Sequence, residues 1–214
     1  MIEKWCFEAK KAVLPVIHVE SHEQAKRNIE VCIEKDADGC FLIGHGLNDS
    51  ELIDIAREMT IEYDYWIGIN CLGSTPKKSI KDAWFMHGVW SDNAFISPQR
   101  EVYQGLYFGG VAFKYQKLNK TLEQDCIDAM QFVDIITTSG SGTGKAPDIE
   151  KIKKMRGYLG NFPLAVASGI TVENVDEFLP YVDCFLVSTG ISKDWQDLDP
   201  IKVSSLVEKV RFSE

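Results

Sequence analysis

The residues of this sequence that could take part in catalysis stand where short apolar runs end. Imidazoles occur at His18 and His45, a carboxylate at Asp92 and an amine at Lys114. An imidazole titrates near neutral pH, a carboxylate can accept a proton, and a lysine can stabilise an anion or form an imine. The polar and glycine residues at the eight run ends are His18, Glu20, His45, Asn70, Asp92, Asn93, Lys114, Thr137, Thr138, Ser168, Gly169, Ser188, Thr189 and Gly190. Run ends are often polar because the chain meets water there, so a shared site depends on the fold.

The elements that must position these residues are eight apolar runs that alternate with amphipathic stretches. The runs start at residues 13, 40, 66, 88, 106, 133, 163 and 184. Each unit of about 24 residues holds one strand, one helix and two short loops. Because crossovers between parallel strands are right-handed, eight units predict an α/β fold, a single-domain (β/α)8 TIM barrel over residues 1–214 with its site at the C-terminal strand ends. A doubly wound open sheet is the alternative, but the turn after the first run lacks the glycines usual there.

Helix starts are predicted from capping residues and prolines. Ser21 with Gln24 matches a capping box, and Thr75 precedes a proline at the first helical position. Further helices are expected to begin at Asp49, Thr121, Asp148, Thr171 and Pro200.

Composition excludes several classes of function. The 214 residues include 32 acidic and 23 basic ones, and the net charge of -9 disfavours binding to nucleic acid. No apolar run approaches the roughly 20 residues of a membrane-spanning helix, and the N-terminus lacks a signal-peptide core. We therefore expect a cytoplasmic protein without membrane insertion, for which a homodimer is a possible assembly. The six cysteines show no C-x-x-C spacing and are expected to be reduced core thiols.

Two glycine turns indicate a phosphate site. Ser168-Gly169 follows the seventh run and Ser188-Thr189-Gly190 follows the eighth. Glycines let backbone N–H groups approach an anion closely, and many TIM barrels bind phosphate after strands 7 and 8. The alternative is that both glycines only permit tight turns.

The loop 139–147 resembles a nucleotide-binding loop but fails its spacing, because Ser139 stands where the first glycine of a Walker A motif is required. Three glycines and small hydroxyl residues suit a lid over the barrel mouth, and a plain flexible loop is the alternative. The lid or substrate-binding residues would be Thr138, Gly142, Thr143, Gly144 and Lys145.

Strand alternation suggests an inward position for Lys114. It shares a face with Gly110 and Ala112, opposite Val111 and Phe113, so it points into the barrel if the latter two pack against helices. Such a lysine could form a Schiff base, bind a carboxylate or phosphate, or form an ion pair with an acidic residue.

The remaining catalytic candidates are Asp92 as general base, with His18 and Asn70 orienting the substrate. His18 and His45 with Glu20 or Asp92 could also hold a divalent metal, but the compact spacing of a metal motif is absent. No cofactor is therefore expected.

The motifs of the C-terminal third resemble the BtpA/SgcQ family. They are Thr138–Asp148 with its T-G-x-x-P-D turn, Ala167–Asn174, and Ser188–Asp194 followed by Asp199-Pro200, and the similarity spans about residues 134–206. Members look like phosphate-binding TIM barrels of the ribulose-phosphate-binding type, and the family's name comes from a role in photosystem I biogenesis. The resemblance implies phosphate ligands at Gly169, Ser188, Thr189 and Gly190. The N-terminal half departs from the family pattern, since the L-P-G-x-P turn expected after the first strand is missing.

Three functions are compatible with these features. The first is an enzyme that acts on a sugar phosphate or phosphoribosyl compound by isomerisation, aldol chemistry or glycosidic transfer. The second is a non-catalytic phosphate-ligand binder that serves as an assembly or regulatory factor. The third is a metal-dependent hydrolase.

Overall fold

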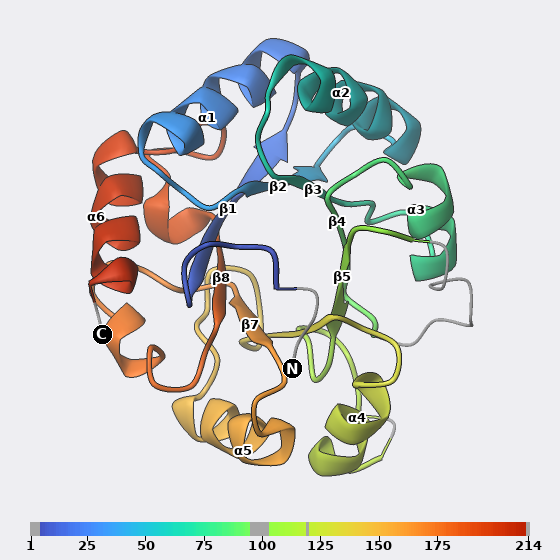
Figure 1. Ribbon diagram of the computed structural model, residues 1–214, viewed down its shortest axis with the longest axis vertical. Helices are drawn as coiled ribbons and strands as arrows, with labels where there is room; N and C mark the ends of the chain where they lie inside the picture. The colour runs from blue at the N-terminus through green and yellow to red at the C-terminus, as the bar shows by residue number, and fades with distance from the viewer. Residues whose placement is uncertain (1–4, 95–102, 119, 213–214) are drawn as a thin grey trace.

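The computed structural model describes residues 5–94, 103–118 and 120–212, which form a closed barrel of eight parallel strands (Figure 1). Neighbours in the barrel are neighbours in the sequence, and β1 pairs with β8 to close it. The strands are β1 (Ala12–Val19), β2 (Cys40–Gly44), β3 (Ile67–Asn70), β4 (Gly88–Ser91), β5 (Leu106–Gly110), β6 (Ile135–Ser139), β7 (Leu164–Ala167) and β8 (Cys184–Val187). The barrel predicted from the eight apolar runs is confirmed.

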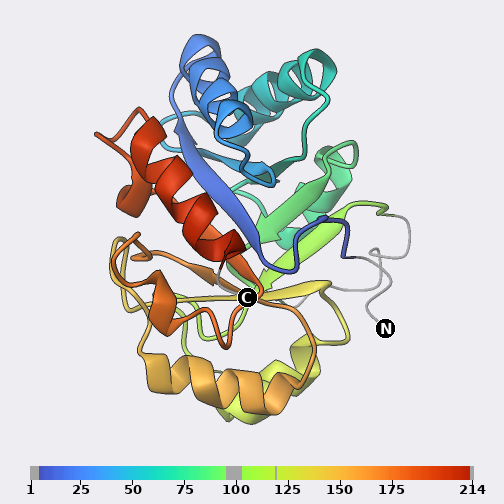
Figure 2. The ribbon, with the colours of Figure 1, turned by 60° about the vertical axis from the view of Figure 1, so that its left-hand side comes forward.

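Helices surround the barrel, and α6 runs alongside β1 (Figures 1 and 2). Their bounds are α1 (His22–Glu34), α2 (Asp49–Glu62), α3 (Pro76–Asp82), α4 (Leu122–Ala129), α5 (Ile149–Leu159) and α6 (Pro200–Arg211). Side chains of Ser21, Thr75 and Thr121 accept hydrogen bonds from amides in the first turns of α1, α3 and α4, as their sequence positions predict. The capping box at α1 is only half formed, because the Gln24 side chain accepts from the amide of Glu20.

The segment that begins at Thr171 does not form the expected α-helix. Only a 3₁₀ turn occurs, at Val175–Glu177. The Asn174 side chain accepts a hydrogen bond from the amide of Thr171 and donates one to the carbonyl of Gly169. These two bonds hold the segment in a turn and satisfy groups that an α-helix would leave open.

Strand β5 stops at Gly110, before the expected end at Lys114. Ala112 has a φ of 48°, a left-handed conformation that ends extended structure. The alternation of a strand does not continue past Gly110, because Val111 packs between the strands and the helices whereas Phe113 packs inside the barrel. The expectation that both residues face the helices is therefore wrong for Phe113.

The core has two layers, because a closed parallel sheet is buried on both faces. Inside the barrel, Phe41 and Phe108 meet with ring centroids 5.0 Å apart. Outside it, Ile29 of α1 and Ile152 of α5 belong to the layer between strands and helices. Each fully buried apolar side chain contributes about 1.5–3 kcal/mol. The residues at the mouth of the barrel are thus positioned by a closely packed core.

The cysteines are all free, and five of them are buried as expected. Cys6 is exposed, so the expectation of a core thiol is wrong for that residue. Within the described ranges, no helix combines the length and apolar character needed to cross a membrane.

Candidate functional site

A cavity opens where the strands end at their C-termini. It holds about 530 Å³ of space that no protein atom fills, part of it open to solvent. Side chains from the two ends of the sequence meet here because β1 and β8 are neighbours. The lining residues are Val16, His18, Ile43, His45, Trp90, Lys114, Thr143, Gly144, Ala167, Ser168, Leu186, Ser188, Thr189 and Trp195. The cavity lies where TIM barrels carry their sites.

Three rings form one side of this cavity. The imidazoles of His18 and His45 stack with centroids 4.5 Å apart and planes 22° from parallel. The indole of Trp195 lies 4.4 Å from His18 and 5.4 Å from His45, centroid to centroid. The structure therefore brings the two predicted histidines together and adds a tryptophan from the β8–α6 loop.

Both imidazoles are uncharged at neutral pH. Burial lowers the pKa of His18 to about 4, with further lowering by His45 and the Lys114 ammonium. Burial and Lys114 also lower the pKa of His45. Nδ1 of His18 is buried without a hydrogen-bond partner among the described residues, as is Nε1 of Trp90. This side of the mouth thus presents neutral rings.

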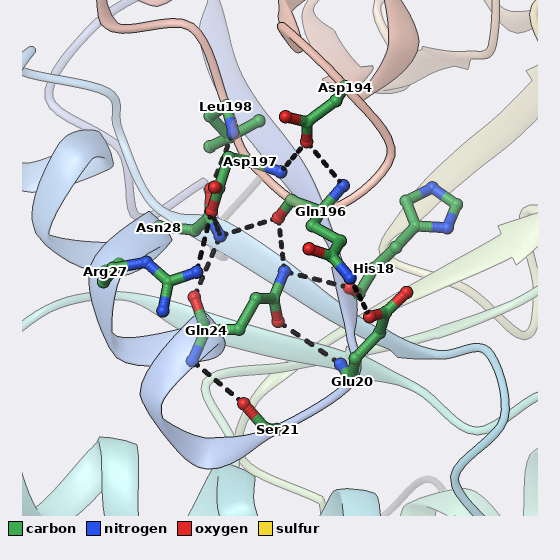
Figure 3. Close-up of polar contacts among 10 residues, drawn as sticks. All are labelled: His18, Glu20, Ser21, Gln24, Arg27, Asn28, Asp194, Gln196, Asp197 and Leu198. Atoms are coloured by element: carbon green, nitrogen blue, oxygen red, sulfur yellow. Dashed lines mark hydrogen bonds and ion pairs between the residues drawn. The ribbon is translucent and has the colours of Figure 1, made fainter.

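The loop residues that follow Trp195 are fixed to α1 by hydrogen bonds (Figure 3). The side chain of Gln24 donates to the carbonyls of His18 and Gln196. The Asn28 side chain donates to the Gln196 carbonyl at 2.9 Å and accepts from the amide of Leu198 at 2.7 Å. Gln24 and Asn28 are buried, which limits the access of competing water to these bonds.

Asp92 and Asn70 pair beside the cavity. The Asn70 amide donates to Oδ1 of Asp92 at 3.4 Å, and the Gln116 side chain donates to the Asp92 carbonyl. Burial raises the pKa of the Asp92 carboxyl above its ordinary value, while Lys114 and the Asn70 hydrogen bond act in the opposite direction. Asp92 is suited to exchange a proton, although it does not line the cavity itself.

Lys114 lines the cavity from the loop after β5 and not from the strand. Its Nζ lies 3.3 Å from Oγ1 of Thr143, and its amide donates to Oγ of Ser139 at 2.8 Å. Its location at the mouth agrees with the sequence expectation. The alternation used to reach that expectation does not hold, because β5 has already ended.

A half-buried lysine of α5 bonds the backbone at the ends of β5 and β6. Nζ of Lys151 donates to the carbonyl of Ala112 at 2.6 Å and to that of Ser139 at 2.8 Å. Burial lowers the pKa of Lys151 to about 8, although Cys126 acts in the opposite direction. The ends of β5 and β6 are therefore tied through one ammonium group.

The glycine turns after β7 and β8 are sites of close backbone contact. Gly169 has a φ of 68°, and a Cβ there would lie 2.0 Å from the amide nitrogen of Ala146. A Cβ at Gly190 would lie 1.9 Å from the carbonyl oxygen of Ile170. No acceptor in the described part of the chain bonds the amides of Gly169, Thr189 or Gly190. The two turns therefore combine required glycines with open N–H groups beside the cavity.

The loop 139–147 lies against these turns. Thr143 and Gly144 line the cavity, whereas Lys145 is exposed and Gly142 half-buried. Thr138 is buried, and its hydroxyl donates to the Ala112 carbonyl at 3.4 Å. Of the five residues predicted for this loop, two reach the cavity.

The remaining candidates lie outside the cavity. Glu20 is exposed and accepts from Gln196, and Asn93 is exposed with its carbonyl bonded to the Tyr107 hydroxyl. Across residues 5–94, 103–118 and 120–212, no three His, Cys, Asp or Glu side chains gather in a group that could hold a metal ion. Within these ranges, no acidic or thiol side chain joins the histidine pair as a third ligand.

Backbone strain concentrates at the same end of the barrel. Of the four described non-glycine residues with positive φ, Ala112, Tyr115 and Ser168 follow β5 or β7, and only Asp36 lies elsewhere, after α1. Such conformations cost on the order of 1–3 kcal/mol and cluster at functional sites.

Sequence reasoning missed Trp195 and Lys151. Trp195 stands in a polar loop without periodic pattern, and Lys151 occupies a helix position that reads as solvated. The sequence did contain one signal for Trp195, because this residue follows shortly after the second glycine turn, Ser188-Thr189-Gly190.

The fold and the cavity at its strand ends define the protein as a TIM barrel with a candidate site at the usual mouth. Residues 110–212 match the model of the BtpA family, which confirms the resemblance seen in the C-terminal motifs. A curated relative, the uncharacterized protein MJ1115 of Methanocaldococcus jannaschii, is 32% identical over 98 residues. That match covers 42% of this chain and 37% of the relative, so the chain spans little more than a third of its length.

Three solved structures with the same fold are similar over nearly the whole chain. A native KDPGal structure superposes with a TM-score of 0.72 at 12% identity, covering 97% of each chain. Phosphoribosylanthranilate isomerase of Thermotoga maritima gives 0.65 at 16% identity, covering 94% of this chain and 98% of its own. KDPG aldolase of Legionella pneumophila gives 0.67 at 16% identity, covering 95% and 94%. At these identities the similarity shows the fold alone.

Proposed function

We propose that this protein is an enzyme that acts on a small phosphorylated metabolite, a sugar phosphate or phosphoribosyl compound, bound at the mouth of the barrel. The observation that carries the proposal is the pair of glycine turns with open amides next to the cavity. The similarity of the fold to an aldolase and to a phosphoribosyl isomerase supports it.

The phosphate would be held by the loops after β7 and β8. The amides of Gly169 and Gly190 supply donors without competing acceptors, and the hydroxyls of Ser168, Ser188 and Thr189 stand beside them. Lys114 adds a positive charge from across the cavity. Backbone donors carry no net charge, so this mode of binding is compatible with an acidic protein.

The chemistry best supported is a proton transfer next to a carbonyl, as in isomerisation or aldol cleavage. Asp92, whose pKa is raised by burial, would take or return the proton. The Lys114 ammonium would stabilise the oxyanion that develops, or its neutral amine would form an imine with the carbonyl. Neutral His18 and Asn70 would orient the substrate.

Thermal melting tests the phosphate site. Ribose 5-phosphate at about 100 times its Kd should add about 2.7 kcal/mol of stability, whereas ribose at the same concentration should add none. Gly190→Ala should abolish the shift, and Gly157→Ala on α5, where a new Cβ meets nothing within 4 Å, should retain it. If neither ribose 5-phosphate nor other sugar phosphates raise the melting temperature, the proposal is wrong.

One observation favours the second function, a non-catalytic binder of phosphorylated ligands. Among the described residues that line the cavity, none carries a carboxylate, and Asp92 and its partner Asn70 are both outside the lining. Binding of a sugar phosphate without turnover, by the wild type and by Asp92→Asn alike, would support this assembly or regulatory role.

A further inference from the structure

The β8–α6 loop carries two different features within a few residues. Ser188 and Thr189 line the proposed phosphate side of the cavity, and Trp195 lines it beside the two histidines. A single loop therefore presents polar donors and a large aromatic ring to the same space. A ligand that filled the space would meet both.

Trp195 keeps about half of its surface exposed, although the loop that carries it is fixed to α1. It remains 48% exposed, while the residues that follow it are bonded to buried amide side chains of α1 (Figure 3). Asp194 adds two bonds, accepting from the amides of Gln196 at 2.9 Å and Asp197 at 2.8 Å. Exposed aromatic surface held in a fixed position at a cavity is suited to contact with a ligand.

The surroundings of Trp195 favour a flat uncharged group. The neighbouring imidazoles are neutral, and the apolar residues that line the same cavity include Val16, Ile43 and Leu186. An ammonium group would find no carboxylate among the lining residues, and Lys114 would repel it. An aromatic ring would gain stacking and lose little hydration.

We propose that the ligand joins its phosphate to a planar aromatic ring, as a nucleoside 5′-monophosphate or a phosphoribosyl arylamine does, and that this ring packs on Trp195 beside His18 and His45. The inference rests on the proposed function, because the phosphate anchors the ligand and Trp195 selects among phosphorylated compounds. Trp195 is then a specificity-determining residue.

Calorimetric titration with ribose 5-phosphate, uridine 5′-monophosphate and adenosine 5′-monophosphate tests the proposal. Stacking of a base on an aromatic side chain should make at least one nucleotide bind about 10-fold or more tightly than ribose 5-phosphate. Trp195→Leu should remove this advantage and leave the affinity for ribose 5-phosphate within about 2-fold, while Trp195→Phe keeps most of it. Trp84→Leu is the matched control, because Trp84 is 68% exposed in a groove at the opposite end of the barrel.

The outcomes separate this proposal from the phosphate site. If ribose 5-phosphate binds but neither nucleotide binds more tightly, the ring subsite is wrong and the phosphate site stands. The ring subsite is also wrong if Trp195→Leu weakens all three ligands equally or if Trp84→Leu acts like Trp195→Leu. If none of the three phosphates binds to the wild type, the proposed function fails and the ring subsite with it. Melting temperatures of the variants check that each one is folded.

Discussion

Replacing Lys151 by methionine should change how the stability of the protein depends on pH. Lys151 is the half-buried ammonium that donates to the carbonyls of Ala112 and Ser139, and partial burial lowers its pKa from 10.5 to about 8. The unfolded chain therefore keeps this proton to a higher pH than the folded one. Wherever the unfolded state binds more protons, stability rises with pH. The free energy of unfolding contributed by this site should increase between about pH 8 and about pH 10.5.

The size of the effect follows from the shift. A lowering from 10.5 to about 8 corresponds to at most about 3 kcal/mol of destabilisation while the amine is charged. Between about pH 7 and about pH 9.5 the wild type should gain about 2 kcal/mol of unfolding free energy relative to Lys151→Met. Partial exposure of the side chain would reduce this value.

Urea unfolding of both proteins at several pH values measures the difference. Lys154→Met, an exposed change on the same helix, serves as control and should follow the wild-type curve. If the free energies of unfolding of wild type and Lys151→Met depend on pH in the same way, the pKa of Lys151 is not lowered in the folded protein. Because Lys151 holds the loops that carry Lys114, the variant should also bind ribose 5-phosphate more weakly.

Further expectations concern a buried imidazole, a close glycine contact and a carboxylate. As the pH falls from about 6.5 to about 4, the free energy of unfolding of the wild type should decrease by up to about 3 kcal/mol, because His18 is protonated in the unfolded chain and stays neutral in the folded one. Urea unfolding of His18→Asn should show a smaller decrease, and an equal decrease would contradict a buried neutral imidazole. Gly190→Ala should melt about 3–10 °C below Gly157→Ala, because its Cβ meets the Ile170 carbonyl; equal melting temperatures would show that the loops yield easily. Asp92→Asn should lower turnover of a converted sugar phosphate about 10²- to 10⁴-fold while ribose 5-phosphate affinity stays within about 2-fold, and unchanged kcat would remove Asp92 from the mechanism.

The barrel could be predicted because local signals agreed along the chain. Apolar runs of strand length recur at a regular spacing, and cap residues such as Ser21, Thr75 and Thr121 stand at the helix starts. The pairing of β1 with β8 then follows from closure. The positions of His18 and His45 at one mouth are a consequence of that topology, which is why run ends indicated them.

Other features depend on contacts that no local pattern reveals. The left-handed backbone at Ala112 ends β5 early and turns Phe113 into the barrel, against simple alternation. The side chain of Asn174 stabilises a turn where a helix start was expected. Trp195 gains its position from hydrogen bonds to α1, a helix far away in the sequence.

A crystal structure of the protein soaked with ribose 5-phosphate would show whether the loops after β7 and β8 bind the phosphate. Phosphate oxygens are expected within about 3 Å of the amide nitrogens of Gly169 and Gly190, with the sugar directed toward Lys114 and His18. A phosphate bound at another place on the barrel, or an empty mouth at a concentration that saturates binding in solution, would contradict this expectation.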